Sequence, residues 1–513
     1  MSWGAHLPIL PIALPLAAGA LMLLIDEKRP SVKAAIGAAS LATLLACAIA
    51  LVDAADGPSP LVYALGGWPA PFGIVLVADR LAAVMVLLAT LLAIASFVFS
   101  LARWHSAPGR FPALLQFLLM GLNGAFLTGD LFNLFVFFEL LLAASYGLAL
   151  HGSGVARVRA SLHYIVVNLA ASLLFLLGVS LIYGVTGTLN MAQLAERIPA
   201  VAAGDRALVE AGASILALAF LVKAAMWPLG FWLPSTYAAA AAPAAALFAI
   251  LSKVGIYAVL RLWLLFFGGA GASDFLLYGG LATLVFGVCG MLAAQGLGGI
   301  AGYSLVVSSG TLLAALSRAD PSVTTGALYY LVASTLGVAA LFLLAELVQR
   351  ARAPGADLLA VTAEAFGIGE DDPGVQTGPA IPATMALLGL AFVGCALLVA
   401  GLPPLPGFVA KLYLLSGILT PQPGPAAWTL TAALLVAGLA AIIALGRAGV
   451  GIFWGAERST PRVLFVEMAP VAGLLALCVA LTVWAGPATR YLQQAAGALH
   501  APAAYIDAVL PRR

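Results

Sequence analysis

The chain has 513 residues, of which 63% are hydrophobic and only 9% are charged, and its formal net charge is +2. Its mean hydropathy of +1.09 is too high for one water-soluble core with a polar surface, so the composition excludes an ordinary soluble protein and predicts a polytopic membrane protein. The basic residues are scattered without interleaved aromatic residues, which excludes a nucleic-acid-binding groove.

Windows of about 20 apolar residues, the length that crosses roughly 30 Å of hydrocarbon, predict membrane-spanning helices along the whole chain. The first half contains seven, near residues 7–25, 34–52, 81–102, 111–129, 131–151, 162–184 and 210–232. The second half contains seven more, near residues 238–263, 275–298, 300–317, 324–349, 379–419, 426–446 and 464–486. The window 379–419 is too long for one straight crossing. We therefore expect an all-α fold with about fourteen transmembrane helices.

Two stretches outside these windows have a composition of their own. In residues 53–80, short β-prone runs flank Gly66 and Gly67, which predicts a small hairpin on the outer face. Residues 352–378 are acidic and rich in glycine, which predicts a solvated cytoplasmic loop.

The basic residues between the windows predict the orientation of the chain, because cytoplasmic loops carry the excess of Lys and Arg. One side holds twelve, namely Lys28, Arg29, Lys33, Arg103, Arg110, Arg157, Arg159, Arg350, Arg352, Arg447, Arg458 and Arg462. The side of both termini holds seven, namely Arg197, Arg206, Arg261, Arg318, Arg490, Arg512 and Arg513. Both termini are therefore expected outside a bacterial inner membrane. Lys28 and Arg29 follow the first apolar run, and no basic residue precedes it, which predicts a first span and not a secretory leader.

The cysteines give no indication of a disulfide framework, a metal site or a cofactor. Cys47, Cys289, Cys395 and Cys478 lie within apolar windows, and none forms a CxxC pair. We expect them to be small packing residues.

Four charged residues inside the apolar windows are the best functional candidates, namely Glu139, Lys223, Lys253 and Lys411. Each such charge costs roughly 2.5 to 3.5 kcal/mol on insertion, so their presence points to charge movement through the membrane. Glu139 lies about 14 Å along its helix from Asp130, near mid-membrane, and Asp130 is expected to cap that helix.

Glu139 needs a cationic partner, for which Lys223 is the natural candidate. A pair that opens and closes acts as a gate, because separation leaves a desolvated lysine whose proton can leave. The alternative is a permanent structural salt bridge. Lys253 and Lys411 have no carboxylate partner in their own windows, and lysine is suited to act as a proton relay. Glu346 is expected to pair with Arg350 at the cytoplasmic edge.

Two helices are interrupted by proline and glycine, which is the best sequence indication of an inverted-repeat transporter. Pro228, Gly230 and Pro234 follow Lys223 in MWPLGFWLP, and Pro403, Pro404 and Gly407 precede Lys411 in GLPPLPGF. None of these runs can continue as a regular helix, so each break is expected beside a hydrated cavity. The alternative is a kinked but inert helix.

Several strings resemble the proton-translocating antiporter-like superfamily, which includes large membrane subunits of respiratory complex I and of Mrp-type cation/proton antiporters. These strings are GDLFNLFVFFELLLAASYGLALHG, LVKAAMWPLGFWLP, LFAILSKVGIYAVLR and GLPPLPGFVAKLYLL. The resemblance covers essentially the whole chain and is nearest to the D-type subunits of Mrp (Mnh, Pha) antiporters. Lys411 in place of a glutamate, and the absence of a long lateral C-terminal helix, favour this family over the complex I subunit.

The resemblance implies helices 1–3 with the outer-face hairpin in residues 1–110, two inverted five-helix repeats in 111–265 and 266–448, and a last helix with a tail in 449–513. It implies proton translocation by Glu139, Lys223, Lys253 and Lys411 in a hetero-oligomeric Na⁺/H⁺ antiporter. Complex I relatives place histidines where this chain has Gly230 and Tyr237. Hydroxyl groups either hold water there or simply pack, namely those of Ser235, Thr236, Ser252, Ser304, Ser308 and Ser309.

Two other functions stay open from the sequence. The chain is alternatively a proton-pumping subunit of complex I or of a membrane-bound hydrogenase, or a structural scaffold whose buried charges only hold helices together. The sequence does not specify the cation or whether that cation passes through this chain.

Overall fold

Helices fill the predicted windows. The computed structural model describes residues 6–26, 28–102, 110–152, 154–349, 383–420, 423–453 and 463–510. The helices of the first half are α1 (Leu10–Leu24), α2 (Pro30–Ala54), α3 (Arg80–Ala102), α4 (Phe111–Leu127), α5 (Leu131–Ala149), α6 (Val155–Thr186), α7 (Met191–Arg197), α8 (Ala203–Lys223), α9 (Trp232–Ala239), α10 (Ala242–Phe248) and α11 (Leu251–Phe267). Those of the second half are α12 (Ser273–Ala293), α13 (Leu297–Leu316), α14 (Pro321–Gln349), α16 (Ala383–Ala400), α17 (Pro406–Ile418), α18 (Pro425–Phe453), α19 (Phe465–Val483), α20 (Ala485–His500) and α21 (Ala503–Val509).

Within the described ranges, eleven helical segments are long and apolar enough to cross a membrane. Three shorter apolar helices, α1, α4 and α17, add to them. The predicted all-α polytopic membrane fold is therefore confirmed, while the number of fourteen crossings stays a prediction.

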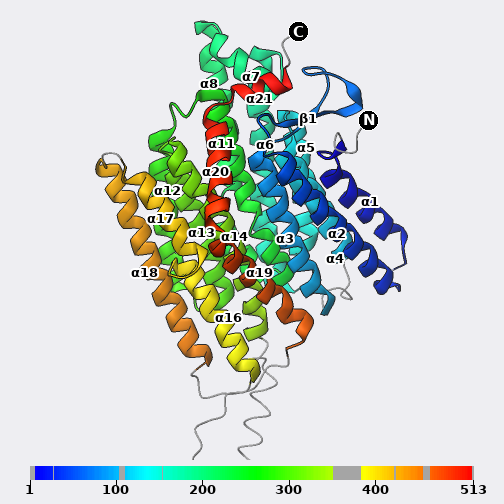
Figure 1. Cartoon of the computed structure of the whole chain (residues 1–513), viewed down its shortest axis with the longest axis vertical. Helices are drawn as coiled ribbons and strands as arrows, with labels where there is room; N and C mark the ends of the chain where they lie inside the picture. Colours follow the sequence, from blue (N-terminus) through cyan, green and yellow to red (C-terminus); the bar gives the residue numbers. More distant parts are fainter. Residues whose placement is uncertain are drawn as a thin grey trace, which may run out of the picture.

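The predicted hairpin is present. Strands β1 (Leu61–Ala64) and β2 (Val75–Ala78) pair antiparallel, with Leu61 opposite Ala78, and short 3-10 helices are η2 (Leu65–Gly67) and η3 (Ile198–Ala200). The hairpin, α7 and α21 lie at one end of the molecule, where both chain ends are also marked (Figure 1). We call this the hairpin end.

Helix α14 is the centre of the bundle. It packs against α3, α10, α13, α16, α17, α19 and α20, and most of its side chains are buried. Helix α14 therefore connects elements from the first third of the chain, such as α3, with elements from the last third, such as α20.

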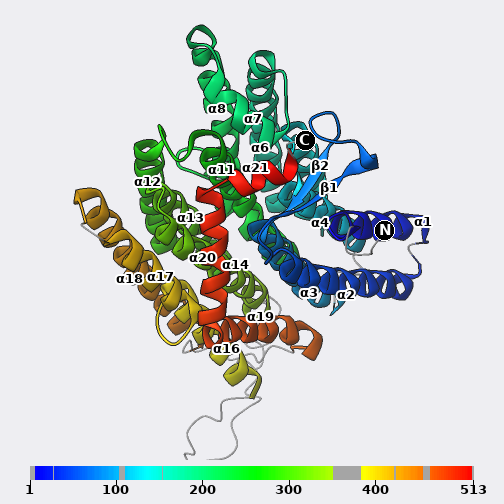
Figure 2. The same cartoon turned by 45° about the horizontal axis from the view of Figure 1, so that its top comes forward.

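The C-terminal region differs from the predicted tail. Helices α20 and α21 follow α19, and α20 runs along α14 toward the hairpin end (Figure 2). The sequence AGPATRYLQQAAGALH mixes polar and apolar residues on alternate faces of a helix, so no apolar window detects it.

One further prediction needs correction, and one needs a finer description. The window 238–263 lies largely within one membrane-crossing segment, Ala242–Phe267, in which Ala249 and Ile250 form a turn between α10 and α11. Arg261, counted above as a loop residue, lies inside α11 and is 6% exposed. The acidic loop 352–378 and seven of the counted arginines lie outside the described residues, namely Arg103, Arg350, Arg352, Arg458, Arg462, Arg512 and Arg513.

Candidate functional site: a row of buried lysines

Glu139 is held on α5 by local capping and by a neighbouring helix. Asp130 begins α5 as predicted, since its carboxylate accepts a hydrogen bond of 2.8 Å from the backbone N–H of Asn133. Glu139 is half-buried and accepts a hydrogen bond from the hydroxyl of Ser172 on α6. A neutral hydroxyl, not a cation, is thus the hydrogen-bond partner of this carboxylate.

Lys223 is the last residue of α8 and is 4% exposed. Its ammonium lies 5.0 Å from the ring centroid of Phe138, the residue before Glu139. Within the described part of the chain it has no hydrogen-bond partner and forms no ion pair with Glu139. The structure therefore places the expected partners on adjoining helices, but in a separated arrangement.

A break in the helical structure lies directly after Lys223. Residues 224–231 separate α8 from α9, with Pro228 and Gly230 in the break and Pro234 already in the first turn of α9. The freed backbone N–H of Trp227 donates to the hydroxyl of Thr283 over 2.8 Å. A Cβ on Gly230 would lie under 3.0 Å from the carbonyl oxygen of Ala225, so only glycine permits this close approach.

Lys253 lies in the first turn of α11 and has no exposed surface. Its ammonium donates a hydrogen bond of 2.8 Å to the hydroxyl of Ser308 on α13. That hydroxyl is 3.0 Å from the hydroxyl of Ser334 on α14. The two hydroxyls therefore continue the polar contact of Lys253 toward α14.

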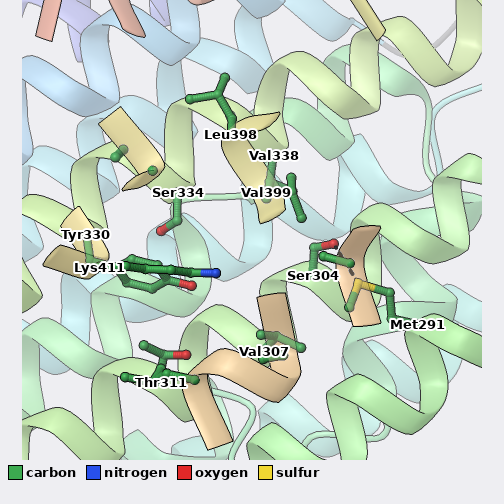
Figure 3. Close-up of a pocket in the computed structure, with 16 residues that line it drawn as sticks. Met291, Ser304, Val307, Thr311, Tyr330, Ser334, Val338, Leu398, Val399 and Lys411 are labelled. Atoms are coloured by element: carbon green, nitrogen blue, oxygen red, sulfur yellow. Dashed lines mark hydrogen bonds between the residues drawn. The ribbon is translucent and has the colours of Figure 1, made fainter. Parts of the chain in front are cut away.

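Lys411 reaches a cavity that also contains Ser334. Its ammonium donates to the carbonyl oxygen of Ala400, the last residue of α16, over 2.6 Å. Figure 3 shows the ammonium pointing into this cavity, between the hydroxyls of Ser334 and Thr311. The cavity leaves about 30 Å³ for the centres of water molecules, enough for about two waters at roughly 10–15 Å³ each. Polar contacts therefore extend from Lys253 through two serines to the cavity of Lys411.

The second break resembles the first in how it is closed. Residues 401–405 separate α16 from α17, with Pro403 and Pro404 in the break and Gly407 in the first turn of α17. A Cβ on Gly407 would lie under 3.0 Å from the carbonyl oxygen of Leu398. In both halves, then, a glycine packs against a backbone carbonyl close to where the preceding helix ends, at Ala225 just after α8 and at Leu398 near the end of α16.

Glu346 contacts the start of a helix, while its predicted pairing with Arg350 stays a prediction. Its carboxylate accepts a hydrogen bond of 3.2 Å from the backbone N–H of Ala242, at the start of α10. Arg350, its expected partner, lies outside the described residues. Glu346 therefore stabilises a helix N-terminus, where a negative charge is favourable.

The sequence did not lead us to one buried ion pair. Arg261 on α11 donates to both carboxylate oxygens of Asp79, over 2.8 Å each. The spacing from Lys253 to Tyr257 to Arg261, four residues each time, would have indicated a polar stripe on one helix face. The described residues contain no group of three His, Cys, Asp or Glu side chains placed to hold a metal ion.

These features define a class: a multi-helix membrane protein with two broken helices and ionisable groups in its interior, the architecture of an ion-translocating protein. Residues 128–437 match the family model described as NADH:quinone oxidoreductase/Mrp antiporter, transmembrane. The chain belongs to this family.

Two relatives extend over nearly the full length. The chain is 54% identical to the D-type subunit of a probable K(+)/H(+) antiporter of Rhizobium meliloti strain 1021, over 99% of this chain and 98% of the relative. It is 35% identical to the D-type subunit of the Na(+)/H(+) antiporter of Bacillus subtilis strain 168, over 98% and 99%. The resemblance to the D-type antiporter subunits is thus confirmed.

Solved structures show the same fold. A chain of the Mrp complex from Dietzia sp. DQ12-45-1b superposes with a TM-score of 0.84 at 28% identity, over 99% of this chain and 100% of that one. A chain of a membrane-bound sulfane sulfur reductase superposes with a TM-score of 0.81 at 23% identity, over 99% and 100%, and shows the fold alone.

Proposed function

We propose that this chain is the proton-translocating D-type subunit of a multi-subunit antiporter that exchanges an alkali cation for protons. Full-length relatives bear the names of K(+)/H(+) and Na(+)/H(+) antiporter subunits, which supports cation/proton exchange without selecting the cation. The match to a chain of an Mrp complex supports work within a hetero-oligomeric membrane assembly. It is a transporter component and not an enzyme.

The observation that carries this proposal is the buried row from Lys253 to Lys411. The row begins at the Lys253 ammonium and continues by hydrogen-bonding distances through the hydroxyls of Ser308 and Ser334. It ends in the cavity of Lys411, which has room for about two waters. Each of these groups can both give and accept a proton, directly or after deprotonation. A scaffold that only locks helices needs no such continuity.

Glu139 and Lys223 act in this proposal as a gate. In the separated arrangement, Lys223 is buried beside Phe138 without a hydrogen-bond partner among the described residues. In this arrangement no described carboxylate contacts the Lys223 ammonium directly. When Glu139 approaches, the ion pair holds that proton on Lys223.

Two finer points belong to the same proposal. The repeats extend over residues 111–265 and 266–448, supported by one broken helix in each and by the glycine that closes each break. The hairpin end faces outward in a bacterial inner membrane, supported by the excess of Lys and Arg in the loops of the other side. Labelling of a cysteine introduced at exposed Gly67 in intact cells tests the orientation.

The experiment measures cation-dependent proton movement in inverted vesicles that contain the whole complex, at matched assembled amounts. Glu139→Ala and Lys223→Ala are expected to abolish it with assembly intact. Glu210→Ala is the control, because Glu210 is an exposed residue of α8 that pairs only with neighbouring Arg206. Full activity in both test variants would replace the gate with the scaffold function. Parallel runs with K⁺ and Na⁺ identify the cation.

A further inference from the structure

Helix α11 presents three polar residues on one face, Lys253, Tyr257 and Arg261. Residues four apart on a helix are neighbours, and eight residues extend about 12 Å along the axis. Arg261 pairs with Asp79, the residue after β2, so the stripe leads from the buried lysine toward the hairpin end (Figure 1).

Arg261 is fixed more firmly than any lysine of the row. Its guanidinium donates to both oxygens of Asp79 over 2.8 Å and lies over the rings of Tyr257 at 5.0 Å and Tyr505 at 5.6 Å. Asp79 is itself held, since one of its oxygens accepts the backbone N–H of Ala82 over 2.9 Å. Both bonds to Asp79 start at Nη2 of Arg261, and the two ring contacts add to them in holding the guanidinium in place.

Polar groups continue beyond this pair. The hydroxyl of Tyr505 on α21 is buried and has no hydrogen-bond partner among the described residues, and the same holds for Nε of Arg261. A Cβ on Gly129 would lie 3.4 Å from the Tyr505 hydroxyl oxygen, so this hydroxyl lies beside half-buried Asp130. Polar groups therefore lie on both sides of Arg261. Arg261 separates those near Lys253 from those at the hairpin end.

We propose that the Asp79–Arg261 pair is a fixed-charge seal that prevents protons at Lys253 from leaving toward the hairpin end. The inference rests on the proposed function, because a seal matters only if Lys253 carries protons. A guanidinium does not lose its proton, so it cannot relay one. The native pair is close to neutral as a whole, whereas removal of the guanidinium leaves the negative charge of Asp79 uncompensated. At about 12 Å and an effective dielectric constant of about 20, one such charge raises the occupancy of a nearby proton roughly tenfold.

The test variant is Arg261→Gln in the whole complex. Without the Arg261 guanidinium, the carboxylate of Asp79 becomes a proton acceptor. Protons can then pass from Lys253 to Asp79 and on toward the hairpin end. An imposed pH gradient across vesicles, in the absence of any antiported cation, is expected to decay about tenfold faster than with the native complex. Arg261→Lys keeps the charge and is expected to decay at the native rate, whereas a purely structural role would make both variants fail.

The chain offers a matched control in the next residue along from Asp79. Arg80 forms an ion pair of 2.9 Å with Asp56 at the same end, and the Asp56 side chain is 52% exposed. Arg80→Gln is therefore expected to leave the decay unchanged. Should Arg261→Gln fail to assemble, the double variant Asp79→Asn with Arg261→Gln removes both charges and buries no unpaired ion. Because it also removes the carboxylate that would accept the proton, it is expected to decay at the native rate, and a leak in it overturns the seal.

Two outcomes separate the seal from the proposed function. Native decay in Arg261→Gln with antiport preserved overturns the seal and leaves the function standing. Adding Lys253→Met to Arg261→Gln is expected to stop the leak, and a leak that persists means that protons bypass Lys253, which also overturns the seal. Full antiport in Lys253→Met alone contradicts the proposed function instead.

Discussion

Ser308 is the residue whose removal most directly tests the buried row. Its hydroxyl accepts the Lys253 ammonium over 2.8 Å and lies 3.0 Å from the Ser334 hydroxyl. Ser308→Ala removes both contacts with the loss of one oxygen atom. Its neighbour Ser309 is equally buried, but its hydroxyl has no hydrogen-bond partner among the described residues. Ser308→Ala therefore breaks the buried row and Ser309→Ala does not, although the two side chains are equally buried.

The size of the effect follows from the kind of hydrogen bond that is lost. A hydrogen bond to a charged group contributes about 1.5–3 kcal/mol, and about 1.4 kcal/mol changes a rate tenfold. If protons pass through Ser308, the variant Ser308→Ala is expected to slow cation-dependent proton movement between about tenfold and a hundredfold. Ser309→Ala removes an unpaired group and is expected to stay within about twofold of the native rate.

The assay is the pH change inside inverted vesicles that contain the whole complex, after addition of K⁺ or Na⁺, with rates divided by the amount of assembled complex. Equal rates in the two alanine variants would refute a relay through Ser308. Equal losses of assembly in both would show that the hydroxyls act in packing and not in proton transfer.

Four further substitutions test the surroundings of the buried row and of Glu139. Gly438→Ala places a Cβ 3.1 Å from both the Lys411 ammonium and the Ala400 carbonyl oxygen, so transport should fall with assembly intact. Gly446 is on the same helix, but a Cβ there has nothing within 4 Å, so Gly446→Ala should transport normally in the same vesicles. Ser172→Ala removes the hydroxyl that donates to Glu139 and should slow transport. Ser180→Ala loses only a hydrogen bond to the Leu176 carbonyl of its own helix and should not. A native rate in Ser172→Ala would contradict the gate. Gly230→Ala and Gly407→Ala must displace backbone and should lower the thermal stability of the purified complex, and unchanged melting would show that the breaks adapt freely.

The sequence predicted the parts that depend on a single residue in an apolar surrounding. Lys223, Lys253 and Lys411 are conspicuous because a charge inside a hydrophobic window is rare, and Pro228 and Pro403 are conspicuous because proline ends a helix. It did not predict the partners of these residues. Ser308 and Ser334 follow Lys253 by 55 and 81 positions, and a serine in a membrane helix is as often a packing residue as a polar contact.

Residues at the edges of windows were predicted least well. Arg261 lies near the end of the predicted window 238–263, where a basic residue normally indicates a loop, and only the approach of Asp79 from the hairpin shows that it is buried inside α11. Helix α20 escaped detection for a related reason. Its polar residues suit a helix that packs along α14 and α3 on one side only, and a search for uniformly apolar windows passes over such a pattern.

Helix α11 combines two kinds of buried cation with opposite properties. Lys253 contacts only neutral oxygen, and a neutral partner does not hold the ammonium in its charged form as a carboxylate does. Arg261, two turns further on, donates from Nη2 to both oxygens of the Asp79 carboxylate and lies over the rings of Tyr257 and Tyr505, and its charge is permanent. A lysine in the place of Arg261 with the same carboxylate would be locked in its charged form, and an arginine in the place of Lys253 could never release a proton. The distribution of the two residue types along one helix therefore matches a proton site that is free to exchange toward α13 and α14 and closed toward the hairpin end.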